Sequence, residues 1–133
     1  MSDETHLLEL LNGRNLPTVH VPAGDKLFLQ GESAGSMYVV VSGALEVLMF
    51  GRILERVGPG GIVGEMALID AGTRSAAALT ETDCELICVG REAFLNIIRD
   101  KPSVALAVLA VMARRLRAVT QAKLGTAGRR APA

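Results

Sequence analysis

Aromatic residues are scarce in this chain: one Tyr, three Phe and no Trp make up 3% of its 133 residues. Half of the residues are nevertheless hydrophobic, so the core must consist of Val, Leu, Ile, Met and Ala. The longest apolar run, Val104–Ala113, is half of the ~20 residues that a membrane-spanning helix needs. The acidic start, Met1–Glu4, leads into no signal peptide. These features predict one globular domain in the cytoplasm, with no membrane insertion.

Cysteine and histidine are also scarce, which excludes several kinds of site. Cys84 and Cys88 are the only cysteines, and on an extended strand they would lie roughly 13 Å apart, beyond disulfide reach. His6 and His20 stand alone, so no metal-ligand spacing is visible. The chain also lacks a Ser/His/Asp set, a Cys/His set and a Gly-Lys-Ser/Thr phosphate loop. We therefore expect a binding protein that is not an enzyme and has no metal or cofactor.

The segment Gly58–Ala78, by contrast, combines several features of a ligand site. After a glycine-rich start, Gly64 and Glu65 precede the short apolar segment Met66–Ile69, and Arg74 follows. A helical turn beginning at Gly64 would direct free N–H groups at an anion. Arg74 could bind phosphate oxygens through two hydrogen bonds, and Glu65 would suit a hydroxyl donor such as a ribose. The segment therefore indicates a site for a nucleotide monophosphate.

This segment resembles the phosphate-binding cassette of the cyclic-nucleotide-binding domain family, which includes the protein kinase A regulatory subunit, cyclic-nucleotide-gated channels and the catabolite activator protein. The resemblance also covers Val21–Gly24, Gln30–Glu32 and Met37–Gly43. It implies a cyclic nucleotide ligand, with cAMP slightly favoured over cGMP. It implies Arg74, Ser75, Ala67 and Ala76 for the phosphate, Glu65 and Gly64 for the ribose, and Val47, Val63 and Arg117 for the base.

Alternatives stay open for several of these residues. Arg74 could be an ordinary solvated loop arginine, and Glu65 could simply cap the helical turn that follows it. Among the arginines of the last helix, Arg114 and Arg115 could cover the base as well as Arg117. Val63 stands where many relatives have an aromatic residue, a departure that concerns the base pocket rather than phosphate binding.

Turn signals recur about every eight residues from Thr18 onward, which predicts a β-sandwich or barrel. The resemblance implies a mainly β fold, an antiparallel, jelly-roll-like β-roll with a short N-terminal helix and two C-terminal helices. The predicted strands are Thr18–Val21, Lys26–Gln30, Met37–Ser42, Ala44–Phe50, Ile53–Val57, Ser75–Leu79 and Cys84–Val89. The predicted helices are Thr5–Leu11, Arg91–Arg99 and one that begins near Asp100, with Asp100 as a possible N-cap. We expect a single domain over residues 1–124 and a flexible tail over residues 125–133.

Charge is distributed unevenly although the net charge is zero. Residues 1–90 carry 5 basic and 12 acidic side chains, and residues 91–133 carry 9 basic and 2 acidic ones. Such a basic end could bind an anionic partner. Its basic residues are scattered along a predicted helix, however, which favours contact with the acidic part of the same chain.

The last predicted helix also carries a line of apolar residues, the seam, that could pack against a partner. Its first ten residues are apolar on every side, which predicts burial of that part. Too few residues follow Gly125 for a helix-turn-helix domain, so no direct DNA binding is expected. The helix is expected to act on an effector domain, a partner protein or a second copy of the chain. The alternative function is a ligand-free interaction or dimerisation module with the same fold. The candidate homodimer residues, at four-three spacing, are Leu109, Met112, Leu116 and Val119.

Overall fold

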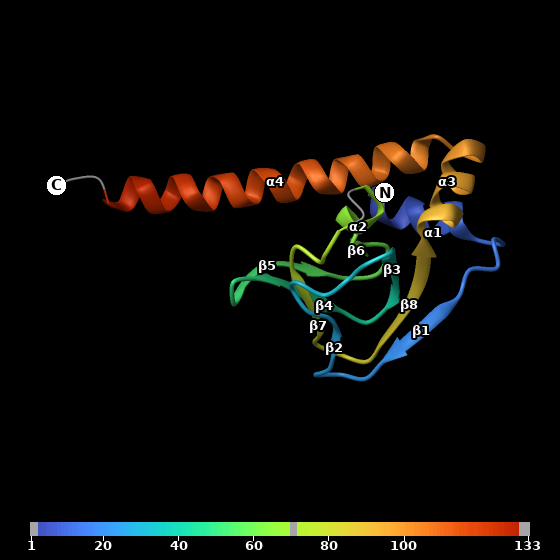
Figure 1. Cartoon of the computed structure of the whole chain (residues 1–133), viewed down its shortest axis with the longest axis horizontal. Helices are drawn as coiled ribbons and strands as arrows, with labels where there is room; N and C mark the ends of the chain where they lie inside the picture. Colours follow the sequence, from blue (N-terminus) through green and yellow to red (C-terminus); the bar gives the residue numbers. More distant parts are fainter. Residues whose placement is uncertain (1–2, 70–71, 131–133) are drawn as a thin grey trace.

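Two antiparallel four-stranded sheets form a β-roll that is covered by helices in the computed structural model, which describes residues 3–69 and 72–130 (Figure 1). One sheet has the strand order β1-β8-β3-β6 and the other β2-β7-β4-β5. The strands are β1 Thr18–Val21, β2 Lys26–Phe28, β3 Ser36–Ser42, β4 Leu45–Met49, β5 Arg52–Val57, β6 Ile62–Val63, β7 Ala77–Thr80 and β8 Cys84–Gly90. The helices are α1 Asp3–Leu11, α2 Met66–Ile69, α3 Arg91–Asp100 and α4 Ser103–Arg130. The predicted fold class is thus confirmed.

Alternation along the strands divides the apolar residues between two cores. Val40, Val47 and Leu86 belong to the core inside the β-roll. Met37 and Val39 of β3 belong instead to the core under the helices, which also receives residues from α1, α3 and the first turns of α4. Side chains of a strand point alternately to its two faces, so β3 can contribute to both cores. The shared strand joins the helical cover to the β-roll.

The break between α3 and α4 differs from the prediction. Asp100 is the last residue of α3 and does not cap α4. The turn is made by Lys101, whose φ of −136° and ψ of 83° lie outside the helical region. A residue before proline is disfavoured in helical conformation, and Pro102 follows Lys101. The proline therefore separates the two helices, and α4 begins at Ser103.

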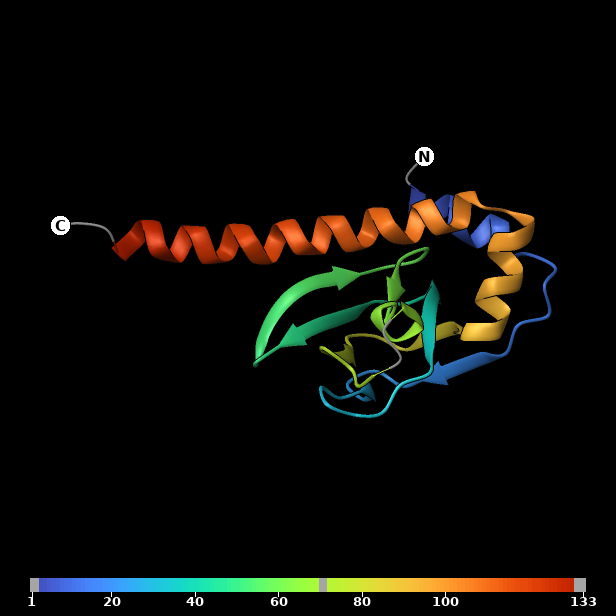
Figure 2. The ribbon, with the colours of Figure 1, turned by 45° about the horizontal axis from the view of Figure 1, so that its top comes forward.

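Helix α4 is longer and more exposed than the sequence suggested. It continues through Arg130, so residues 125–130 are helical, whereas the sequence predicted a flexible tail; residues 131–133 lie outside the described residues. A glycine inside a helix costs only about 1 kcal/mol, so Gly125 need not end one. The apolar start is not buried on every side: Leu106 is 69% exposed and Leu109 53%. Figures 1 and 2 show the C-terminal part of α4 extending past the β-roll.

One further difference from the prediction is local. The sequence missed β6, because two residues are too few to show an alternating pattern. The hairpin between β4 and β5 turns at Phe50 and Gly51, with φ of 52° and 76°. Two consecutive positive φ values are typical of the type I′ turn, which suits strand twist. Among the described residues, no helix is both long and apolar enough to cross a membrane.

Candidate functional site

A cavity of about 520 Å³ lies between the β-roll and α4. The cassette contributes its wall on one side and α4 contributes Leu109, Met112, Ala113, Arg115, Leu116 and Val119 on the other. The wall also includes eight of the nine residues predicted for the site, namely Gly64, Glu65, Ala67, Arg74, Ser75, Ala76, Val47 and Val63. The structure therefore brings together residues from distant parts of the sequence around one space.

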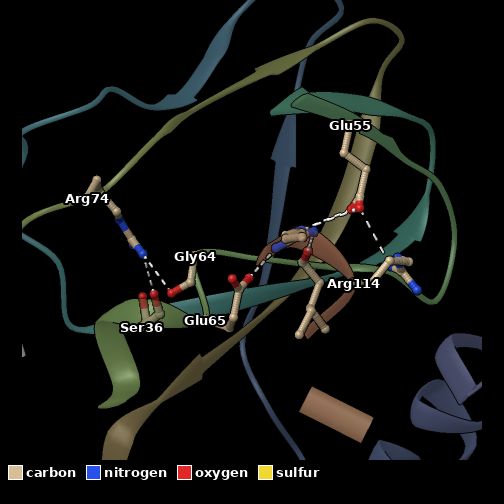
Figure 3. A network of polar contacts seen from close by, with 8 residues as sticks. Ser36, Glu55, Gly64, Glu65, Arg74 and Arg114 are labelled. Atoms are coloured by element: carbon tan, nitrogen blue, oxygen red, sulfur yellow. Dashed lines mark hydrogen bonds and ion pairs between the residues drawn. The ribbon is translucent and has the colours of Figure 1, made fainter. Parts of the chain in front are cut away.

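Arg74 lies in this wall with only 6% of its surface exposed. Its Nη1 donates hydrogen bonds to the carbonyl oxygens of Ser36, at 2.7 Å, and Gly64, at 3.2 Å (Figure 3). Its guanidinium carbon lies 4.1 Å from the centre of the Phe28 ring and 5.7 Å from that of Tyr38. Contacts of a cation with aromatic faces are attractive, more so where water is excluded. Arg74 is thus a buried, oriented cation rather than a solvated loop arginine.

The Nε atom of Arg74 is buried and has no hydrogen-bond partner among the described residues. A buried donor without an acceptor costs about 1–3 kcal/mol, and more if it is charged. Burial lowers the pKa of Arg74, an effect partly offset by Tyr38, Cys88, Glu32 and Glu65. Arginine stays protonated in proteins even so. A buried positive charge with an unused donor is well suited to binding an anion.

Close packing at Gly64 makes this position of Arg74 possible. Gly64 has a φ of 77°, and a Cβ atom added there would lie 2.4 Å from Nη1 of Arg74. Only glycine combines this backbone conformation with such an approach. Short helix α2 begins two residues later, and the Ala67 N–H donates to the Gly64 carbonyl at 3.2 Å. The Ala67 amide, predicted to bind phosphate, is therefore engaged within the cassette in this structure.

Glu65, at 5% exposure, is paired with an arginine of α4. Arg115 contacts the Oε1 atom of Glu65 through Nη1 and the carbonyl oxygen of Ile62 through Nη2. Its Nε donates to Glu55 of β5 at 2.9 Å (Figure 3). One guanidinium therefore bridges two carboxylates of the β-roll and fixes α4 above the cassette.

The structure distinguishes among the arginines of α4 that the sequence offered as candidates for covering the base. Arg115 lines the cavity, whereas Arg117, predicted to contact the base, is exposed and does not line it. Two residues along a helix correspond to a rotation of about 200°, so the two side chains point to opposite sides. Arg115 shares its face with Met112 and Val119, three and four residues away. This spacing in the sequence could have identified Arg115 as the arginine that lines the cavity.

The rest of the cavity wall is mostly apolar and includes Val47, Met49, Leu54 and Val63. The combined site offers an oriented cation, a carboxylate nearby and an apolar compartment. Such a cavity can bind a ligand with an anionic group, a hydroxyl and a flat apolar part. The described residues contain no group of three His, Cys, Asp or Glu that could hold a metal ion.

Comparisons with known proteins agree with this geometry. A family described as the cyclic nucleotide-binding domain matches residues 18–101, more than half of the chain. The cyclic AMP receptor protein of Thermus thermophilus is 41% identical over 101 residues, which cover 72% of this chain and 47% of that protein. The cAMP-activated global transcriptional regulator CRP of Escherichia coli is 34% identical over 110 residues, with coverages of 78% and 52%. The chain thus spans about half the length of these relatives.

Solved structures also match the fold. The catabolite activator protein of Thermus thermophilus has a TM-score of 0.75 at 34% identity and covers 90% of this chain and 62% of its own. A cAMP-bound PfPKA-R structure has a TM-score of 0.76 over 91% of this chain and 45% of its own, but at 14% identity it shows the fold alone. The matched proteins are receptors and regulators, which agrees with the non-enzymatic role expected from the sequence.

Proposed function

Because the chain belongs to the cyclic nucleotide-binding domain family, we propose that it is a regulatory module that binds a cyclic nucleotide, with cAMP slightly favoured over cGMP. The observation that carries the proposal is the buried Arg74, whose Nε has no partner, in the same cavity as Glu65. Two of the relatives are named for cAMP, which supports the preference. The alternative, an interaction module without ligand, leaves the buried, unpaired donor unexplained.

In the proposed complex, Arg74 binds the cyclic phosphate with help from Ser75 and Ala76. Glu65 accepts a hydrogen bond from the ribose 2′-hydroxyl, next to Gly64. The base enters the apolar compartment beside Val47 and Val63. The Ala67 amide can contribute only if its bond to the Gly64 carbonyl opens.

We expect calorimetric titration of the purified protein to give micromolar or tighter binding of cAMP or cGMP. 5′-AMP, which has an open phosphate with a further charge, should bind at least about tenfold more weakly, because the site holds one rigidly oriented guanidinium. Absence of heat with all three, together with an unchanged melting temperature, would support the ligand-free alternative.

We propose that α4 carries the response to the ligand. Residues of α4 line the cavity, and the helix extends beyond the β-roll (Figure 2). A ligand that binds more tightly to one placement of α4 would increase the population of that placement. A second copy of the chain could pack against the part of α4 that extends beyond the β-roll. Such packing would stabilise this part, because helices in proteins are stabilised mainly by tertiary contacts. No direct contact with DNA is expected from these residues, and the cytoplasmic location stays a prediction.

The residues predicted for the dimer seam differ in burial. All four predicted residues line the cavity, but Met112 and Val119 are half-buried, whereas Leu109 and Leu116 are 53% and 68% exposed. Leu106, which does not line the cavity, is 69% exposed. The spacing of these exposed leucines, three and seven residues, is that of a coiled-coil seam. We therefore propose Leu106, Leu109 and Leu116 as the core of a helix–helix interface between two copies.

Leu106→Glu should convert a dimer into a monomer, because it places a charge in this seam without lining the cavity. Size-exclusion chromatography with light scattering measures the mass. Leu95→Glu is the matched control, since Leu95 is an exposed leucine of α3, at 45%, and should leave the dimer intact. A wild-type protein that is monomeric with and without ligand would rule out the seam.

A further inference from the structure

Arg115 makes a charged cross-link between α4 and the β-roll. Its three nitrogens contact three different groups: Glu55 through Nε, Glu65 through Nη1 and the Ile62 carbonyl through Nη2. The side chain of Arg115 is 14% exposed, and those of Glu55 and Glu65 are 20% and 6% exposed. Each nitrogen of Arg115 thus contacts the β-roll or the cassette, so the side chain ties α4 to both.

Glu55 anchors this cross-link from outside the cavity. It belongs to β5, whereas Glu65 belongs to the cassette, and it does not line the cavity itself. Its Oε1 accepts from Nε of Arg115 at 2.9 Å, and its Oε2 lies 3.6 Å from an Arg114 nitrogen (Figure 3). Two adjacent arginines of α4 thus converge on Glu55, which fixes where the Arg115 guanidinium lies.

The position of Arg115 in turn determines what Glu65 can accept. Arg115 contacts Oε1 of Glu65, and a carboxylate has about four acceptor positions, so other lone pairs remain for a hydroxyl. A buried carboxylate is costly unless it is paired, and Arg115 provides that pairing for Glu65. A displaced guanidinium would either leave Glu65 unpaired or cover both of its oxygens. Either change weakens a hydrogen bond from a ligand hydroxyl.

We propose that Glu55 is a positioning residue for ribose recognition: it holds Arg115 so that Glu65 is oriented toward the ligand 2′-hydroxyl. The inference rests on the proposed function, because it assumes that the cavity binds a cyclic nucleotide. Glu55 acts through Arg115 and touches no ligand. It therefore ties the ribose contact to the placement of α4.

The test compares the affinities for cAMP and 2′-deoxy-cAMP in wild type, Glu55→Gln and Glu55→Asp. Gln keeps the size but removes the charge, and Asp keeps the charge but withdraws it by one methylene group. The matched control is Glu46→Gln on the neighbouring β4, since the Glu46 side chain is 22% exposed and lies 3.6 Å from Arg56 on the surface. Calorimetry gives the ratio of the two dissociation constants for each protein.

Wild type and Glu46→Gln should bind cAMP about tenfold or more tightly than 2′-deoxy-cAMP, because a hydrogen bond to a charged group is lost. In Glu55→Gln and Glu55→Asp the ratio should fall to about threefold or less, mainly through weaker cAMP binding. A general structural effect would weaken the binding of both ligands equally and leave the ratio of their dissociation constants unchanged. That result would overturn the inference. A wild-type ratio near one would also overturn it. If wild type bound neither ligand, the proposed function itself would fail, and the inference with it.

Discussion

Arg74→Ala should weaken cAMP binding by about 2 kcal/mol or more, which is about thirtyfold. The change removes a buried, permanently charged donor whose Nε has no protein partner. Its orientation by Ser36, Gly64 and Phe28 is already established without ligand, so the cost of ordering the side chain is low. Calorimetric titration measures the effect, and Arg74→Lys, which keeps the charge but loses the planar fork, should give an intermediate value.

The matched control is Arg56→Ala, because Arg56 is an exposed arginine of β5 that pairs with Glu46 and Glu81 away from the cavity. It should leave the affinity unchanged. Melting temperatures of both variants without ligand separate an effect on folding from one on binding. Affinity at the wild-type level in Arg74→Ala would remove Arg74 from the account.

Gly64→Ala is expected to affect both stability and binding. The new Cβ would lie 2.4 Å from Nη1 of Arg74 and 3.3 Å from the Phe28 ring, so the guanidinium has to move. We expect binding about tenfold weaker or worse, since the phosphate contact depends on that position. The positive φ adds about 1 kcal/mol of lost stability. Titration and chemical denaturation measure the two effects.

Gly24→Ala provides the matched control, because Gly24 has the same φ of 77° but nothing within 4 Å of its added Cβ. Gly24→Ala should lose only the stability that an alanine at positive φ costs, and it should bind the ligand with wild-type affinity. If Gly64→Ala bound ligand as tightly as Gly24→Ala, close packing against Arg74 would be irrelevant to the site.

The sequence predicted the β-roll well because its signals are local. Turn glycines such as Gly43 and Gly51 have positive φ. The alternation of apolar and polar residues between such turns predicted the strands. The cassette was recognisable for the same reason, since Gly64, Glu65 and Arg74 lie within one short segment. Local patterns failed where the signal was short, as in β6, or where a proline rule outweighed a capping preference, as at Lys101.

The partners of the site residues could not be predicted, because they depend on contacts between distant segments. Phe28 under Arg74 and Glu55 beside Arg115 are separated by 46 and 60 residues, and no local pattern links them. The choice of Arg115 over Arg117 depends on the rotation of α4 about its axis, which its packing against the β-roll fixes. The residues of the predicted seam differ in burial for the same reason, with Met112 half-buried and Leu109 53% exposed.

A crystal structure of the chain with cAMP tests the central claim most directly. The account predicts the cyclic phosphate within hydrogen-bond distance of Nε of Arg74, which satisfies the unpaired donor, and the ribose 2′-hydroxyl on the Glu65 carboxylate. The adenine should lie in the apolar compartment beside Val47 and Val63, under α4. Nucleotide bound elsewhere, or a cavity left empty at saturating cAMP with Arg74 in its present position, would contradict the account.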